Sequence, residues 1–284
     1  MEQYIKRFHY YHADASAFGA TLETPVSDIV PAQASISLPV IGGYLTSRVE
    51  KFNYEGMFSF ESAYTNVAGT VSTKNAGWVS MVTASVQGLN ILDIVTADQV
   101  VTKIMTEHPR DPRDGYDPKV SFVGSRIEGL RVGGYPVKVT LDLDMCDQGD
   151  AESYPGKSCI EDRKFLGAAE QQYRRMNDAK KSYPGWVRDR SIPAWVKDRY
   201  QWDNARRGRR GAVVCSLVKE LEGEFPGRPC GHVLEIPEFG KIFLAELLVD
   251  HNSYRMIMMR LELGCGTKGN GGIGGGNIEG RTFP

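Results

Sequence analysis

The sequence predicts a mainly β protein, most simply an antiparallel β-sandwich, and three observations support this prediction. Short runs of β-branched residues recur along the chain, separated by Gly, Asn, Asp and Pro. Glycine accounts for 31 of the 284 residues, which suits a turn-rich β fold. A segment with helical periodicity interrupts this pattern at 155–210. We therefore expect two β blocks, 36–154 and 211–263, that complete one domain around a helical insertion, with a short β-solenoid or barrel as the alternative.

The composition argues against several broad classes of protein. Hydrophobic residues make up 41% of the chain, too many for general disorder, and the net charge of −1 favours neither nucleic acid nor membrane surfaces as partners of the whole chain. No apolar run approaches the roughly 18 residues that a membrane-spanning helix needs. The N-terminal segment has no apolar core of the kind found in signal peptides, so none is predicted.

The cysteines do not indicate a metal site. Their spacing fits neither a zinc pattern nor a CxxC motif, and their number, five, is odd. Isolated reduced thiols are the expected state, while Cys146–Cys159 and Cys215–Cys230 could each close a short loop. We expect no metal and no cofactor.

The first β block contains an internal repeat. Before it, residues 44–52 and 56–64 are predicted strands, with a turn at 66–69. Val-Gln-Gly-Leu-Asn-Ile at 86–91 then matches Ile-Glu-Gly-Leu-Arg-Val at 127–132. In each copy we expect a strand to end, the glycine to turn the backbone, and a second strand to begin with an inward leucine. The repeat therefore predicts paired hairpins in one sandwich.

An acidic cluster ends this block. Asp142, Asp144 and Asp147 could supply oxygen ligands to calcium, but the EF-hand pattern fails because Cys146 and Pro155 occupy ligand positions. Asp142 and Asp144 share one face of a strand, where a carboxylate pair could act as acid and base. The simplest interpretation is a solvated strand end, and we predict no catalytic residue.

The insertion is basic, whereas the rest of the chain is acidic. Residues 157–210 contain 15 basic and 7 acidic residues, a net charge of +8, which leaves the remainder of the chain with a net charge of −9. Within it, 165–181 is predicted to be an amphipathic helix. Its apolar side would take Phe165, Ala169, Tyr173 and Met176.

Basic and aromatic residues alternate in the second half of the insertion. This pattern is typical of surfaces that neutralise phosphates and stack on bases. Alternatively, the tryptophans pack on the sheet and the basic residues pair with the acidic body, either of the same subunit or of the next one. The candidate contacts to a polyanion or a subunit are Arg188, Arg190, Lys197, Arg199, Arg206, Arg207, Arg209, Arg210, Trp186, Trp195 and Trp202.

Both ends of the chain carry candidate contacts. Residues 1–35 form an aromatic arm that either straps its own domain or docks on a neighbouring subunit. Its candidate contact residues are Tyr4, Phe8, Tyr10 and Tyr11. The Gly-rich tail, 264–284, is predicted to be flexible or to extend along a neighbour. It is not a phosphate loop, because no helix is predicted after its glycines.

Two blocks of the chain, roughly 69–145 and 233–263, resemble bacterial choice-of-anchor P type proteins. The resemblance rests on Gly69-Thr-Val-Ser-Thr, Ser85-Val-Gln-Gly-Leu-Asn-Ile, Val95-Thr-Ala-Asp, Ile236-Pro-Glu-Phe-Gly-Lys-Ile-Phe-Leu-Ala-Glu and Met259-Arg-Leu-Glu-Leu. It implies a β-rich, secreted or surface-exposed protein without known catalysis. The basic insertion and the lack of a signal peptide depart from that pattern.

These observations favour a non-enzymatic structural or surface protein that assembles with copies of itself, as a homo-oligomer or filament, through its arm, insertion and tail. The alternative is a binding module that holds an anionic polymer, nucleic acid or polysaccharide, through the basic insertion. We expect no small-molecule substrate.

Overall fold

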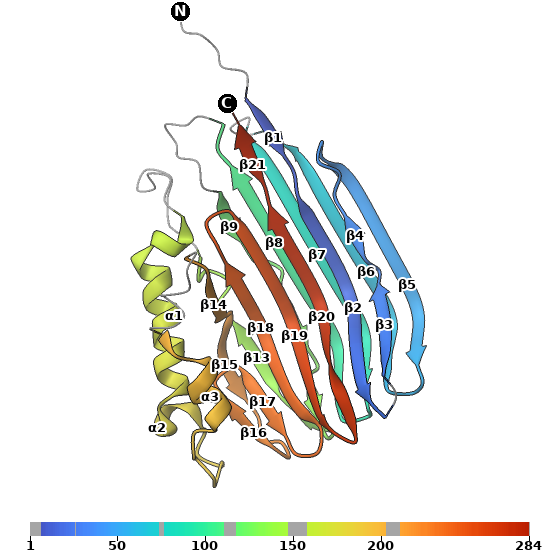
Figure 1. The fold of residues 1–284 in the computed structure, drawn as a ribbon, viewed down its shortest axis with the longest axis vertical. Coiled ribbons are helices and arrows are strands. Elements are labelled where there is room, and N and C mark those ends of the chain that lie inside the picture. The colour runs from blue at the N-terminus through green and yellow to red at the C-terminus, as the bar shows by residue number, and fades with distance from the viewer. Residues whose placement is uncertain are drawn as a thin grey trace, which may run out of the picture.

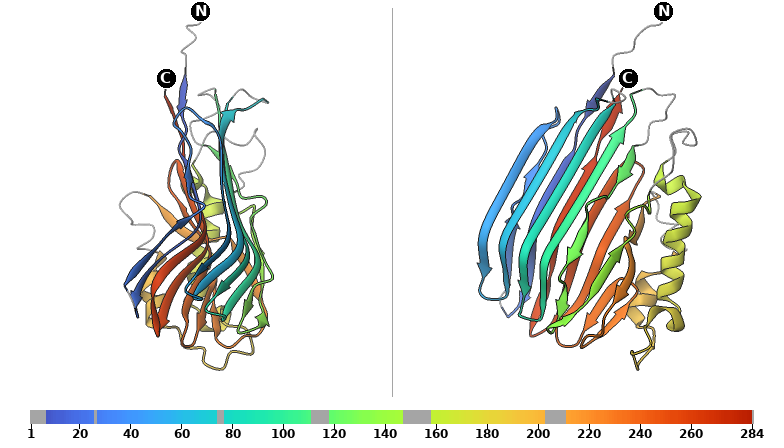
Figure 2. Two further views of the ribbon diagram at one scale, coloured as in Figure 1. Left: turned by 90° about the vertical axis from the view of Figure 1, so that its right-hand side faces the viewer. Right: turned by 180° about the vertical axis from the view of Figure 1, so that it is seen from behind.

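The computed structural model describes residues 7–25, 27–73, 77–110, 118–146, 158–202 and 211–283. Two antiparallel sheets pack face to face, and helices cover one side of the pair (Figures 1 and 2). The sheets are not closed into a barrel, so the predicted mainly β, antiparallel sandwich is confirmed.

Sheet one is built from four long neighbouring strands, joined by short turns. They are β5 (Gly43–Tyr54), β6 (Phe58–Val71), β7 (Trp78–Ile91) and β8 (Val95–His108). Short strands continue the sheet beyond β8: β9 (Lys119–Ser121), β10 (Arg126–Glu128), β11 (Arg131–Val132) and, paired to β11, β12 (Tyr135–Pro136). The predicted turn at 66–69 is wrong. These residues lie inside β6 and pair with both neighbouring strands.

Sheet two combines the beginning and the end of the chain. Its main path is β16 (Arg228–Cys230), β17 (Val233–Ile236), β18 (Gly240–Val249), β19 (Ser253–Cys265), β20 (Thr267–Glu279), β2 (Ala13–Thr24) and β3 (Asp28–Gln33). β4 (Ile36–Ser37) also pairs with β2, and β14 (Val213–Ser216) with β18. β1 (Phe8–Tyr10) and β21 (Arg281–Phe283) pair beyond β2 and β20.

The Gly-rich tail is not flexible, so that prediction is wrong. It forms β20, which is paired on one side with β19 and on the other with β2. Glycine is needed because sheet one lies close: a Cβ on Gly276 would lie 2.7 Å from Val82 Cγ1. The tail and most of the arm are therefore neighbouring strands of one sheet.

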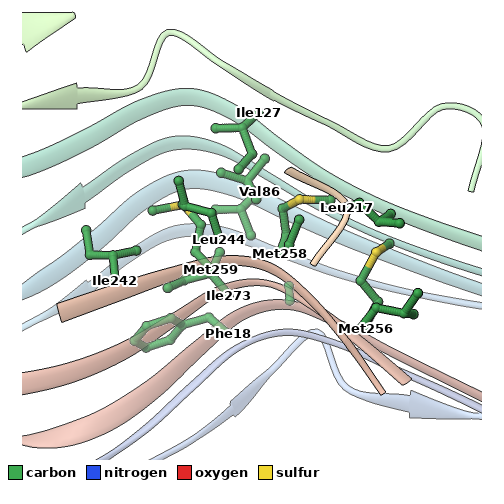
Figure 3. Close-up of a cluster of buried hydrophobic side chains, with 14 of the residues drawn as sticks. Phe18, Val86, Ile127, Leu217, Ile242, Leu244, Met256, Met258, Met259 and Ile273 are labelled. Atoms are coloured by element: carbon green, nitrogen blue, oxygen red, sulfur yellow. The ribbon is translucent and has the colours of Figure 1, made fainter. Parts of the chain in front are cut away.

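A row of residues in the left-handed backbone conformation crosses each sheet, and we call the two rows the kink rows. In sheet one the row contains Lys51, Gly88 and Gly129; in sheet two it contains Ala34, Ala245 and Gly274. Each of the six interrupts the pairing of its own strand or lies between two short strands. Within a sheet, the interruptions of neighbouring strands lie side by side. The strands bend together in the core (Figure 3).

The kink rows change the spacing of core residues from two to three. Inward positions that flank the rows include the pairs Val49 and Phe52, Phe60 and Ala63, Val86 and Leu89, Ala97 and Val100, Ala15 and Phe18, Leu244 and Leu247, and Met256 and Met259. The internal repeat is two copies of this feature, so its interpretation as paired hairpins is wrong. The first copy stays within β7 and the second joins β10 to β11; Gln87 and Glu128 both pair with Gln99 of β8.

The described part of the insertion, residues 158–202, contains three α-helices: α1 (Arg163–Met176), α2 (Ala179–Ser182) and α3 (Ala194–Arg199). A 3-10 turn, η3 (Cys159–Glu161), precedes them, and β13 (Lys138–Leu141) pairs with β15 (Val218–Glu222) on the same side of the sandwich. The predicted amphipathic helix at 165–181 is confirmed as far as Met176 by α1, whose four predicted apolar residues are all buried. Its predicted end is wrong, because α1 stops there and a separate helix, α2, follows. Cys146, Cys159, Cys215 and Cys230 are buried thiols and form no disulfide with one another.

Candidate assembly interface

The three tryptophans of the insertion lie against their own chain. Trp195 packs edge-on against Phe243, and its Nε1 donates a hydrogen bond to Glu235 at 3.1 Å. Trp202 packs against Tyr173 of α1 in the same way. The third, Trp186, lies against Phe225, with the ring centroids 5.6 Å apart. All three are half-buried, and Trp195 is the one whose printed contacts join the insertion to sheet two.

Arg199 joins the insertion to a buried carboxylate of the sheet. Its guanidinium donates to Glu246 and to Glu262, each at 3.2 Å. Arg260 of β19 also donates to both carboxylates. The guanidinium carbons of Arg199 and Arg260 lie 4.5 and 3.7 Å from the centroid of the Phe243 ring. The predicted pairing of basic insertion with acidic body therefore occurs within one subunit at this point.

Glu246 is ionised at the centre of this network. Its side chain lies at the outer face of β18, beneath α3, and the residue is 8% exposed. Burial by itself raises the pKa of Glu246, but hydrogen bonds from His232 and Arg260, and the charge of Arg260, outweigh burial and lower this pKa to about 2. A carboxylate held in this way, with its oxygens occupied by arginine, is a structural anchor and not a free base.

The other basic candidates do not join this network. Arg188, Arg190 and Lys197 are exposed. The guanidinium of Arg190 donates to carbonyls of its own segment, at Val187 and Gly185. The remaining four candidates, Arg206, Arg207, Arg209 and Arg210, lie outside the described residues.

The aromatic arm is divided between the core and the surface. Tyr11 is buried, whereas Phe8 and Tyr10 are exposed beside Phe283 of the neighbouring β21. Tyr4 lies outside the described residues. The arm thus packs largely against its own domain, with two aromatic side chains open to solvent.

The acidic candidates do not form a metal site in the part of the chain that is described. Asp142 is half-buried, Asp144 is exposed, and Asp147 lies outside the described residues. No three His, Cys, Asp or Glu side chains among residues 7–25, 27–73, 77–110, 118–146, 158–202 and 211–283 come together as a metal site.

The four ends of the two sheets differ in how they are protected. A sheet edge exposes unpaired N–H and C=O groups, and proteins commonly block it with proline, a short strand or a covering element. In sheet two, β3 contains Pro31 and β16 contains Pro229. In sheet one, β12 is two residues long and contains Pro136. The fourth end, β5, is 12 residues long and has no proline.

The open edge of β5 lies on the side of the molecule opposite the helices (Figure 1). No residue of β5 is buried. Exposed apolar side chains lie on or next to it: Tyr44 and Leu45 at its start, and Ile41, 91% exposed, just before it. The alternating residues at 44–52 predict a half-buried strand here but do not reveal its edge position, because pairing partners are not visible in a single strand. The missing proline was the available signal.

The chain belongs to a family without an assigned function. Residues 9–250 match the family model described as Domain of unknown function (DUF8256). No curated protein and no solved structure matches the chain, so the resemblance to choice-of-anchor proteins stays a prediction. Within the described residues, no helix combines the length and apolar character needed to cross a bilayer.

Proposed function

We propose that this member of the family is a non-enzymatic structural protein that assembles with a second copy of itself by pairing the β5 edges of two subunits. The observation that carries the proposal is the contrast between β5 and the other three sheet ends, which are short or contain proline. A long edge without proline is a site for strand addition, because the backbone groups on either side of the interruption at Lys51 can pair with another strand.

The sequence of β5 complements itself in antiparallel pairing. With Val49 opposite Val49 of the partner subunit, Arg48 faces Glu50 of the partner subunit, and the same contact recurs across the two-fold axis. Within one chain, Arg48 and Glu50 already form a 2.6 Å ion pair, so the dimer would alternate charges along one face. Directly opposed unlike charges stabilise antiparallel strand pairs. A closed two-fold dimer satisfies both edges at once.

A head-to-tail filament through sheet one is supported less well. It would need β5 to pair with the far end of the sheet, where β12 has only two residues, one of them Pro136. Such a contact would leave most of the β5 edge unpaired. The described parts of the insertion and tail pack against their own chain, and so the proposed assembly rests on β5 instead.

Charge reversal tests this proposal by sedimentation velocity at several protein concentrations. We expect the wild-type chain to be a dimer. Arg48→Glu, or Glu50→Arg, turns two attractive cross-strand pairs into two repulsive ones and should weaken the dimer about tenfold. The double exchange, Arg48→Glu with Glu50→Arg, should restore it, since the opposite charges are then merely transposed.

Arg126 and Glu128 provide a matched control. They form the same type of ion pair, two residues apart, on β10 at the other side of sheet one. Arg126→Glu should leave the dimer unchanged. A chain that remains monomeric at high concentration would refute the proposal, and so would a double exchange that fails to recover the dimer.

A further inference from the structure

Two histidines from opposite sheets meet at the end of the core. His9 lies in β1 and His108 is the last residue of β8, with their ring centroids 4.5 Å apart. His9 is 8% exposed and His108 is 1% exposed. Trp78, which pairs with His108 across β7 and β8, stacks on the His9 ring at 5.3 Å. The imidazole pair is therefore enclosed by the two sheets.

Both Nε2 atoms point to the same small space. Each lies 2.8 Å from the position that a Cβ on Gly280 would occupy, so the two nitrogens are separated by no more than twice that distance. Both atoms are buried, and neither has a hydrogen-bond partner within the described part of the chain. A buried polar atom without a partner costs about 1–3 kcal/mol. Two such atoms at one point indicate that something binds between them.

Two buried hydroxyls lie one step further along the same face of these strands. Ser80 of β7 and Thr106 of β8 face each other directly, one inward step from Trp78 and His108. Their side-chain oxygens are buried and lack hydrogen-bond partners among the described residues. Among the described residues, the end of the core thus contains two imidazole nitrogens and two hydroxyls without hydrogen-bond partners, and a hydrated ion could supply partners to all four.

A hydrogen bond orients the His9 ring so that its Nε2 can bind a metal. His9 Nδ1 lies 3.0 Å from Thr282 Oγ1; when Nδ1 carries the proton, it donates there and leaves Nε2 with a lone pair.

We propose that His9 and His108 bind one divalent transition-metal ion through their Nε2 atoms, with water at the remaining coordination positions and the hydroxyls of Ser80 and Thr106 bonded to that water. Imidazole suits copper, nickel and zinc, and copper binds most tightly in this series. A pocket of about 430 Å³, lined by His108, Glu279 and Gly280 among others, adjoins the site and provides an approach. The ion would join β1 to β8 and so connect the two sheets.

Copper titration of the metal-stripped full chain tests the site. Cu²⁺ quenches nearby indoles, and Trp78 is in contact with His9, so tryptophan fluorescence should fall and saturate at one Cu²⁺ per chain. Trp78→Phe should bind the same amount of copper by calorimetry with less quenching. His9→Gln and His108→Gln should each weaken binding roughly tenfold or more. His12→Gln is the matched control, since His12 lies on the same segment but beside Asp14 at the surface, and should leave the affinity unchanged.

Electron paramagnetic resonance of the wild-type complex keeps the proposal testable if the glutamine variants fail to fold. Two coordinated imidazole nitrogens should split the copper signal, and a signal from one nitrogen or none would overturn the proposal. Quenching that does not saturate, or that persists in folded His108→Gln, would overturn it as well. The absence of any copper binding would also overturn the proposal and would leave water as the occupant of the site.

Discussion

The hydroxyl of Thr102 in sheet one donates a 2.5 Å hydrogen bond to the carbonyl of Gly274 in sheet two. Gly274 belongs to the kink row, where the left-handed backbone directs a carbonyl out of the strand ladder and into the core. Buried carbonyls need donors. The other carbonyls of this row are satisfied similarly, that of Ala34 by Thr65 Oγ1 and that of Ala245 by the Leu217 amide.

Thr102→Val should destabilise the sandwich. Valine has nearly the same shape but cannot donate, so Gly274 would keep a buried carbonyl without a partner, at a cost of about 1–3 kcal/mol in the free energy of unfolding. Urea unfolding measures this change. Thr83→Val is the control, because Thr83 lies on β7 and is not fully buried, and it should shift the free energy by less than about 0.5 kcal/mol. Equal effects of the two substitutions would contradict a special role for Thr102.

Gly274→Ala should also destabilise the protein, for a backbone reason. Gly274 has φ of 63°, a conformation that costs an L-residue roughly 1–2 kcal/mol, and its new Cβ would lie 2.9 Å from Thr102 Oγ1. Gly275 follows it in the same strand, with its nearest neighbour to a Cβ 3.6 Å away. Gly275→Ala should therefore be neutral or stabilising by up to about 1 kcal/mol. Thermal unfolding of the two variants measures this difference. A higher melting temperature for Gly274→Ala than for Gly275→Ala would contradict the prediction.

The ionisation of Glu246 should make the free energy of unfolding depend on pH. Its pKa falls from the ordinary value of 4.5 in the unfolded chain to about 2 in the folded one. Between these values the unfolded chain binds the proton and the folded chain does not, so this contribution is fully present above pH 4.5 and is lost as pH falls toward 2. The loss is on the order of 3 kcal/mol. Unfolding free energies of the wild type and Glu246→Gln, measured from pH 5 to pH 2, should converge over this range.

Other buried groups titrate in both proteins and cancel in that difference. At pH 7, Glu246→Gln should be less stable than the wild type, since Arg199 and Arg260 lose the charge of their shared partner. Parallel curves for the two proteins between pH 4.5 and pH 2 would show that Glu246 is not held ionised by this network.

Features that depend only on residues close together in the sequence were predicted correctly. The spacing of Phe165, Ala169, Tyr173 and Met176 predicted one buried face of a helix, and all four are buried. By contrast, the spacing of three around Gly88 was interpreted as a strand end, because a regular strand alternates with a period of two.

The mainly β class, the helical insertion and its buried helix face could be predicted from residue type and short-range periodicity alone. The pairing of strands far apart in the chain became visible only in the folded structure. It placed the Gly-rich segment between β19 and β2, left β5 at an open edge, and brought His9 against His108. A strand has the same local sequence requirements at the centre of a sheet and at its edge, so only its partners reveal which it is, and both proposals depend on those partners.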